Sequence, residues 1–104
     1  MKAQTLDPSV FAEKAAEAAR FLRALSNEQR LMILCRLSGG EMKVSALLAG
    51  TDLSQSALSQ HLAVLRADGL VATRREGQAI HYRIAEPAVL KLIEALAEIF
   101  CPEE

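Results

Sequence analysis

A short apolar segment, a three-residue connection and a longer capped segment follow one another between residues 44 and 67. Residues 44–49 are predicted to form one helix, which Gly50 ends. Ser54 is the expected N-cap of a second helix that runs to about Ala67. Two helices joined by so short a connection must pack against each other, so this stretch predicts a helix-turn-helix unit.

The second of these helices has one apolar and one small polar face. Leu58, Leu62 and Leu65 recur at helical spacing and are predicted to face the core. The opposite side carries Ser56, Gln60, Ala63 and Ala67, with Ser59 at its edge. Small side chains permit close approach to a major groove, and Gln can pair with adenine. Ordinary surface helices also carry Ser and Gln, so this helix alone leaves both interpretations open.

After Gly69 the spacing of hydrophobic residues changes from a helical period to alternation. Residues 70–75 and 80–84 are predicted strands, joined by a hairpin turn at residues 76–79. Arg74 and Arg75 lead into the turn, with Gln78 and His81 beyond it. A hairpin with arginines beside a recognition helix can hold the DNA backbone or enter the minor groove. The alternative is a solvated turn with routine charges.

Together these elements define a set of candidate DNA contacts. His61 lies on the flank of the helix, where contact with phosphate and packing beside the hairpin are both open, and Tyr82 is assigned to the core. The predicted contacts are Ser54, Gln55, Ser56, Ser59, Gln60, His61, Arg66, Arg74, Arg75 and Gln78.

The rest of the chain is predicted to be helical. A helix capped by Asp7 covers residues 9–25, and a second begins at Ser26, where Gln29 completes a capping box. The last helix begins at Pro87 and reaches Phe100. The predicted fold is mainly α with a β-hairpin wing, in the order α-α-α-α-β-β-α, and residues 1–104 form a single domain.

Composition excludes several classes of protein. No apolar run approaches the ~20 residues needed to cross a bilayer, and no signal-peptide pattern opens the chain, so a cytoplasmic protein without membrane contact is expected. The formal net charge is −1, although residues 54–84 carry four arginines against two acidic residues. The chain lacks a C-x-x-C motif, a glycine-rich phosphate loop, a nucleophile–base pair and a metal-ligand cluster. We therefore expect no enzyme activity, cofactor or metal site.

The last predicted helix is too apolar for a lone small domain. Its polar residues Lys91, Glu94 and Glu98 form one thin stripe, and large hydrophobic residues occupy the remaining surface. A second copy of the chain would cover that surface. The resulting homodimer would present two recognition helices to two half-sites of double-stranded operator DNA.

Three stretches of the chain form a specific pattern: LRALSNEQRLMILCRLSGGE, LSQSALSQHLAVLRADGLV and TRREGQAIHYRI. In the second, Ser-x-x-Ser-x-His-Leu-x-x-Leu at residues 56–65 leads into the wing pattern Arg-Arg-Glu-Gly-x-x-x-x-Tyr. Over nearly its whole length the chain resembles the ArsR/SmtB family of bacterial repressors. The resemblance implies a winged-helix dimer, joined through its first and last helices, that leaves operator DNA when an inducer binds.

The metal sites of that family do not match this sequence. Residues 42–45, where some members carry a Cys-x-Cys pair, contain no thiol, and the last helix contains no His. The chain has Cys35 and Cys101 instead. Their placement resembles the sulfide- and persulfide-responsive branch of the family (the SqrR/BigR type). That branch implies that reactive sulfur species link the two thiols, through a disulfide or a polysulfide, and so release the DNA.

Other interpretations remain open from sequence. A helical Cys such as Cys35 is often only a small buried hydrophobic residue. The thiols could instead sense general oxidants or a soft metal ion. A winged helix that binds only proteins is a further class, although the recognition face without acidic residues and Arg74 and Arg75 argue against it.

Overall fold

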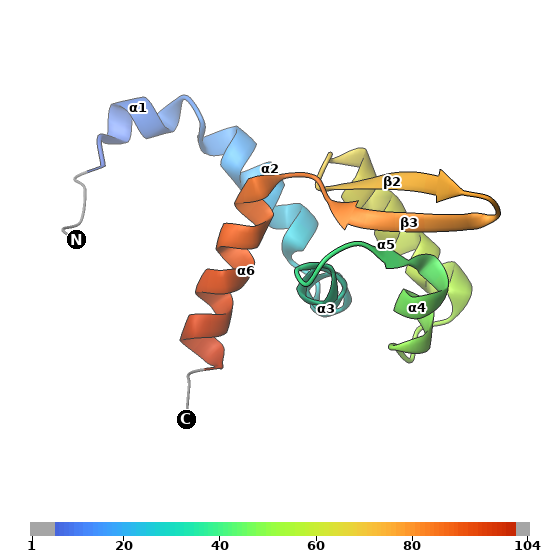
Figure 1. Ribbon diagram of the computed structural model, residues 1–104. Helices are drawn as coiled ribbons and strands as arrows, with labels where there is room; N and C mark the ends of the chain where they lie inside the picture. Colours follow the sequence, from blue (N-terminus) through green and yellow to red (C-terminus); the bar gives the residue numbers. More distant parts are fainter. Residues whose placement is uncertain (1–5, 102–104) are drawn as a thin grey trace.

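The computed structural model describes residues 6–101, and its elements follow in the predicted overall order (Figure 1). They are α1 (Pro8–Ala12), α2 (Ala15–Leu25), α3 (Glu28–Leu37), β1 (Met42–Lys43), α4 (Val44–Ala49), α5 (Gln55–Ala67), β2 (Val71–Glu76), β3 (Ala79–Ile84) and α6 (Pro87–Phe100). The predicted winged helix-turn-helix is therefore confirmed within these residues, with two additions: a break in the first helix and a short extra strand.

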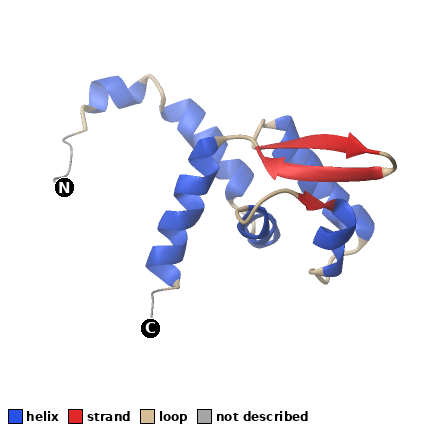
Figure 2. Cartoon of the chain, viewed as in Figure 1, coloured by secondary structure: helices blue, strands red, loops and turns tan. Residues whose placement is uncertain are grey.

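The extra strand turns the wing into a three-stranded antiparallel sheet. The strand order is β1-β3-β2, so β3 lies between the other two strands (Figure 2). Tyr82 on β3 is the register partner of Met42 on β1 and of Thr73 on β2. The hairpin turn is tighter than predicted, because Glu76 already pairs with Ala79. Gly77 adopts a φ of +62° in this two-residue turn, a conformation that glycine reaches without the steric cost of a Cβ atom.

The core forms where α2, α3, α5 and the start of α6 meet the base of the sheet. The three leucines predicted to face inward from α5 do so, since Leu58, Leu62 and Leu65 are each at most 2% exposed. Leu34 of α3 and Val89 of α6 are fully buried beside them. Tyr82 packs partly buried against this cluster, as the sequence predicted. The buried leucines hold α5 firmly, so its polar face has a fixed orientation.

Two predicted helix boundaries are wrong. The helix predicted over residues 9–25 is divided, because Glu13 ends α1 and Lys14, with φ −110° and ψ 0°, precedes α2. The next helix is capped one residue later than predicted. Asn27, not Ser26, supplies the cap, and its side-chain oxygen accepts hydrogen bonds from the backbone N–H groups of Gln29 and Arg30.

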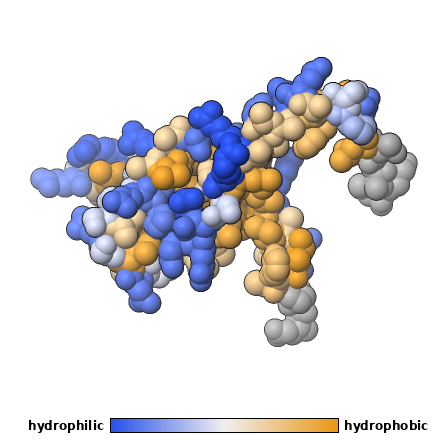
Figure 3. Space-filling model, turned by 180° about the vertical axis from the view of Figure 1, so that it is seen from behind, coloured by the Kyte–Doolittle hydropathy of each residue, from blue (hydrophilic) through white to orange (hydrophobic). Residues whose placement is uncertain are grey.

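Two helical arms project from the core. The radius of gyration is 15.6 Å, against about 13 Å for a compact chain of this length. Phe11 on α1, Leu22 on α2, and Ile99 and Phe100 on α6 are all more than half exposed. Seen from behind, the α6 arm is largely hydrophobic, whereas the opposite side, which carries the wing, is mostly hydrophilic (Figure 3). None of the helices within residues 6–101 is long and apolar enough to cross a membrane.

Candidate nucleic-acid interface

The recognition helix α5 begins at a side-chain cap. Ser54 Oγ accepts a 3.1 Å hydrogen bond from the backbone N–H of Ala57, and it lies 3.4 Å from Ser56 Oγ. The connection that precedes this cap is held by Thr51, whose Oγ1 accepts a hydrogen bond from the backbone N–H of Leu53. Because a capped helix begins at a fixed residue, the polar side chains of its first turn are placed reproducibly.

The outward face of α5 is exposed as predicted. Because Leu58, Leu62 and Leu65 are buried, the opposite side of the helix is turned to solvent. That side carries Ser56, Ser59, Gln60, Ala63 and Ala67, all of them exposed. These side chains are short or flexible, so the helix axis can come close to a partner surface.

A groove separates α5 from the wing and has a volume of about 790 Å³. Its polar lining comes from β1, α4, α5 and the hairpin turn: Lys43, Ser45, Gln55, Ser59, Arg66 and Gln78. Of the described residues that line it, none is acidic. Four of these six were predicted from sequence, whereas Lys43 and Ser45 were not. Their proximity to α5 follows from the pairing of β1 with β3, which no local sequence pattern indicates.

The two wing arginines lie on opposite faces of the sheet. Arg75 is the register partner of Ile80, which lines the groove, and side chains of paired residues share a face. Arg74 is the partner of His81 on the other face, because successive residues of a strand alternate. Arg75 is exposed and makes no ion pair with any residue in the range 6–101.

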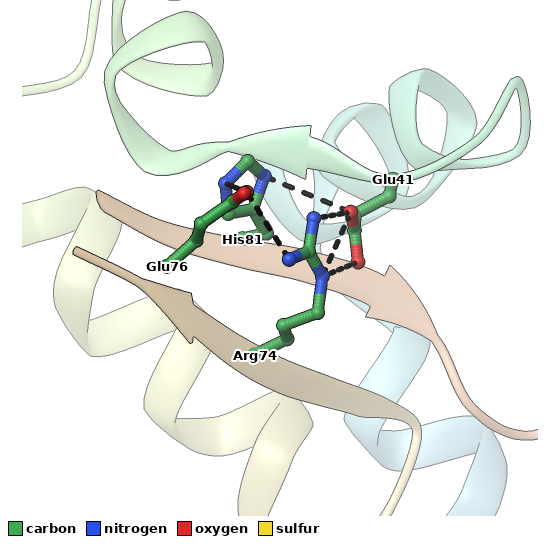
Figure 4. A network of polar contacts seen from close by, with 4 residues as sticks. All are labelled: Glu41, Arg74, Glu76 and His81. Carbon is green, nitrogen blue, oxygen red and sulfur yellow. Dashed lines mark hydrogen bonds and ion pairs between the residues drawn. The ribbon is translucent and has the colours of Figure 1, made fainter. Parts of the chain in front are cut away.

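Arg74 lies in a network with two carboxylates and a histidine (Figure 4). Its Nη2 and Nε atoms donate to Glu41 at 2.7 and 3.1 Å, and its Nη1 donates to Glu76 at 3.2 Å. The His81 ring is 11% exposed and has one nitrogen 3.7 Å from each carboxylate. Hydrogen bonding from Arg74 holds the pKa of Glu41 below its usual value. The Glu41 and Glu76 hydrogen bonds raise the pKa of Arg74.

His61 is partly buried and lies beside α3. Its Nδ1 lies 3.5 Å from Nη1 of Arg30 on α3. The same guanidinium donates from Nε to the carbonyl oxygen of Ala24, near the end of α2. Arg20 of α2 also forms an ion pair of 3.5 Å with Asp68, which ends α5. Polar contacts therefore join α2 and α3 to the recognition helix, in a region where sequence predicted only a phosphate contact or hairpin packing.

The two cysteines lie outside the groove. Cys35 is on α3 and Cys101 ends α6, and both are exposed free thiols in the single chain. Leu34 is fully buried, whereas the neighbouring Cys35 is exposed in the single chain and is not a buried hydrophobic residue there. Within the described range, no three His, Cys, Asp or Glu residues gather as a metal-binding group.

Comparisons with known proteins agree with this geometry. The family model described as "Bacterial regulatory protein, arsR family" matches residues 27–73. The chain is 47% identical over 89 residues to the transcriptional activator HlyU of Vibrio cholerae, covering 86% of this chain and 82% of that protein.

The similarity to solved structures extends over most of the chain. The transcriptional repressor BigR of Xylella fastidiosa is 39% identical with a TM-score of 0.88, covering 94% of this chain and 100% of that one. A homodimeric winged helix-turn-helix DNA-binding domain from Mycobacterium bovis is 34% identical with a TM-score of 0.74, covering 95% and 89%.

Proposed function

Because this chain belongs to the ArsR family of bacterial transcription regulators, we propose that it is a homodimeric repressor that binds operator DNA through α5 and the wing. We further propose that reactive sulfur species release it from DNA by linking Cys35 to Cys101. The family consists of DNA-binding regulators and not of enzymes, so no catalytic step is involved.

The groove between α5 and the wing supports DNA binding most strongly. Its described lining combines amide and hydroxyl groups with Lys43 and Arg66, and it contains no carboxylate. Amides and hydroxyls can read base edges, and cations can neutralise phosphates. We assign the base-facing role to Ser56, Ser59 and Gln60. Phosphate contact is assigned to the groove lysine and arginine and to Arg75.

The exposed arms support a homodimer. Ile99 and Phe100 are 67% and 73% exposed, and Phe11 and Leu22 add apolar area on α1 and α2. Large exposed apolar surface on a small domain marks an interface. The related domain from Mycobacterium bovis is homodimeric, which supports the same assembly here. Pairing through these arms leaves both recognition helices free for two half-sites.

The proposed signal acts on two thiols. One thiolate attacks the outer sulfur of an organic persulfide, R–S–SH, becomes a protein persulfide and releases the thiol R–SH. The second thiolate then attacks the sulfur bonded to the first cysteine's carbon and releases hydrogen sulfide, which leaves a Cys35–Cys101 disulfide. The persulfide is the oxidant and the two cysteines are oxidised. A second persulfide would leave an additional sulfur atom in the bridge. Both thiols are exposed, as this chemistry requires.

A link at Cys35 would act on the helix that holds the DNA-binding unit. The neighbouring residue Arg36 donates hydrogen bonds to the carbonyl oxygens of Ala46 and Gly50 at the end of α4. Near the start of the same helix, Arg30 contacts His61 of α5. A bridge that shifts α3 relative to α6 would therefore be transmitted to both helices of the helix-turn-helix unit.

The test begins with a DNA duplex that the reduced protein selects from a random-sequence library. The protein is then treated with an organic persulfide, hydrogen peroxide or zinc, and its intact mass and DNA affinity are measured. We expect that only the persulfide bridges the two cysteines and only that sample releases the DNA. The Cys35→Ser and Cys101→Ser variants should stay bound, with Ser38→Ala as a control that responds normally.

Other outcomes separate the alternatives. Release by peroxide would indicate a general oxidant sensor, and release by zinc at low concentration would indicate a metal sensor. A bridge without loss of DNA would reject the switch and leave the DNA-binding function intact. A reporter gene behind the selected sequence decides between repression and activation, since one similar protein is an activator.

A further inference from the structure

We infer that Arg74 is a positioning residue of the DNA interface, which fixes the wing against the start of α4 and thereby aims Arg75 and Gln78 beside α5. This inference rests on the DNA-binding part of the proposed function. It also revises the sequence-based assignment, in which Arg74 and Arg75 were equivalent DNA contacts.

The first argument is the strand order. Because the order is β1-β3-β2, the backbones of β1 and β2 share no hydrogen bonds with each other. Glu41 immediately precedes β1, and Arg74 lies on β2, 33 residues later in the chain. Their ion pair therefore spans the middle strand and is the contact that joins the outer strand of the wing to the segment leading into α4 (Figure 4).

The second argument is that carboxylates already hold the guanidinium of Arg74. Each of its three nitrogens has a carboxylate partner, two of them on Glu41 and one on Glu76. The Glu41 contact is bidentate, a geometry that fixes direction as well as distance. Two carboxylates therefore compete with any phosphate for Arg74, whose side chain is 46% exposed, whereas Arg75 has no such competitor among the described residues of the groove face. The side chain of His81 closes the network beneath Arg74 and is 11% exposed.

The third argument concerns what the network controls. Strand β1 pairs with β3 only at Tyr82 and His81, so the part of the hairpin nearer the turn has no third strand, and a two-stranded ribbon is only marginally stable by itself. The groove is defined by the distance between α5 and the Gln78–Tyr82 side of this hairpin. The ion pair between Arg74 on β2 and Glu41 holds the groove-lining side of the hairpin in place. Among the described residues of the wing, Arg75 is then an arginine without a carboxylate partner on the face that lines the groove, whereas Arg83 lies on the other face.

The test measures affinity for the selected duplex over a series of salt concentrations. A residue that contacts phosphate carries part of the salt dependence, and its removal lowers the magnitude of the slope of log K against log salt by about 0.9 per subunit, or about 1.8 for the homodimer. We expect Arg75→Gln to show this lower slope. We expect Arg74→Gln to weaken binding about five- to tenfold with the slope unchanged, because it misplaces contacts without deleting one. Arg74→Lys, which keeps the charge, should bind with intermediate affinity.

The decisive variant is Glu41→Ala. Removing a negative charge near DNA ordinarily strengthens binding, and Glu94→Ala on α6 serves as the charge-matched control. If Glu41 positions Arg74, the change in DNA affinity has the opposite sign, and Glu41→Ala should weaken binding. The Glu41→Ala/Arg74→Gln double variant should then bind DNA no more weakly than Arg74→Gln. Stronger binding by Glu41→Ala, or a slope lowered by Arg74→Gln, would overturn the inference and make Arg74 a phosphate contact.

A measurement without DNA separates this inference from the proposed function. Hydrogen exchange of the Gly77 and Gln78 amides should be faster in Arg74→Gln and Glu41→Ala than in the wild-type protein and Arg75→Gln. Equal rates in all four proteins would reject the positioning role. If the wild-type protein selects no DNA while these rates differ as expected, then the DNA-binding function fails and the network still positions the wing.

Discussion

The guanidinium of Arg36 on α3 donates a 3.0 Å hydrogen bond to the carbonyl oxygen of Gly50, the residue that ends α4. A second bond of 3.3 Å reaches the carbonyl oxygen of Ala46. The last carbonyl groups of a helix have no partner within it, so Arg36 supplies one for Gly50, whereas the Ala46 carbonyl also accepts from the backbone N–H of Gly50. The first helix of the helix-turn-helix unit is thereby joined to the helix that carries Cys35.

This contact predicts a specific cost for Gly50→Ala. A Cβ atom on Gly50 would lie 1.9 Å from Nη2 of Arg36, so the guanidinium must move and its hydrogen bonds are lost. We expect the free energy of unfolding to fall by about 1–2 kcal/mol, measured by urea denaturation at fixed protein concentration. Gly39→Ala is the control, because its Cβ atom would have its nearest contact at 3.8 Å. Equal effects of the two substitutions would contradict this account.

The core of the recognition helix gives a second prediction. Leu65 is fully buried, and its neighbour Val64 is 39% exposed on the same helix. Leu65→Ala should lower the free energy of unfolding by about 2–5 kcal/mol through lost burial and a residual cavity. Val64→Ala should cost less than about 1 kcal/mol, because 39% of the residue is already exposed and its truncation leaves no enclosed cavity. A comparable loss in both variants would mean that the predicted stripe does not anchor α5.

The Glu41 carboxylate predicts a pH dependence. Hydrogen bonding from Arg74, together with the nearby His81 and Arg83, lowers the pKa of Glu41, while Glu76 shares the Arg74 guanidinium. A lowered pKa in the folded protein means that the network stabilises it above the unfolded-state pKa and loses this contribution as the pH falls through the lower, folded value. Carbon-detected NMR titration should give Glu41 a midpoint below that of an unpaired Glu. Arg74→Gln should raise this midpoint, and an unchanged midpoint would contradict the hydrogen bonds between Arg74 and Glu41.

Much of the fold follows from local sequence signals. The leucine stripe at residues 58, 62 and 65, the Ser54 cap and the proline at the start of α6 each determine a local structure within one or two helical turns. The alternating residues on both sides of Gly77 similarly determine the hairpin. These patterns were sufficient to predict the winged helix-turn-helix and the exposed face of α5.

The remaining features depend on contacts between distant residues. Strand β1 is two residues long, too short for alternation to indicate it, and it exists because β3 is there to pair with. The break at Lys14 has no Gly or Pro to mark it. The role of Arg74 depends on Glu41, which no local pattern connects to it. Sequence therefore identified both wing arginines but could not distinguish their faces or partners.

The final prediction concerns dimer formation through the exposed end of α6. Ile99→Glu places a charge on apolar surface that is 67% exposed in the single chain and is proposed to be buried between two copies. The dimer dissociation constant should rise at least about tenfold, measured by sedimentation equilibrium. Lys91→Gln changes the net charge by the same −1 on the polar stripe and should leave the constant unchanged. Because two recognition helices must engage two half-sites together, DNA affinity should fall with Ile99→Glu and recover at higher protein concentration. A variant that stays dimeric, or a loss of DNA binding that does not depend on protein concentration, would place the dimer interface elsewhere than the α6 arm.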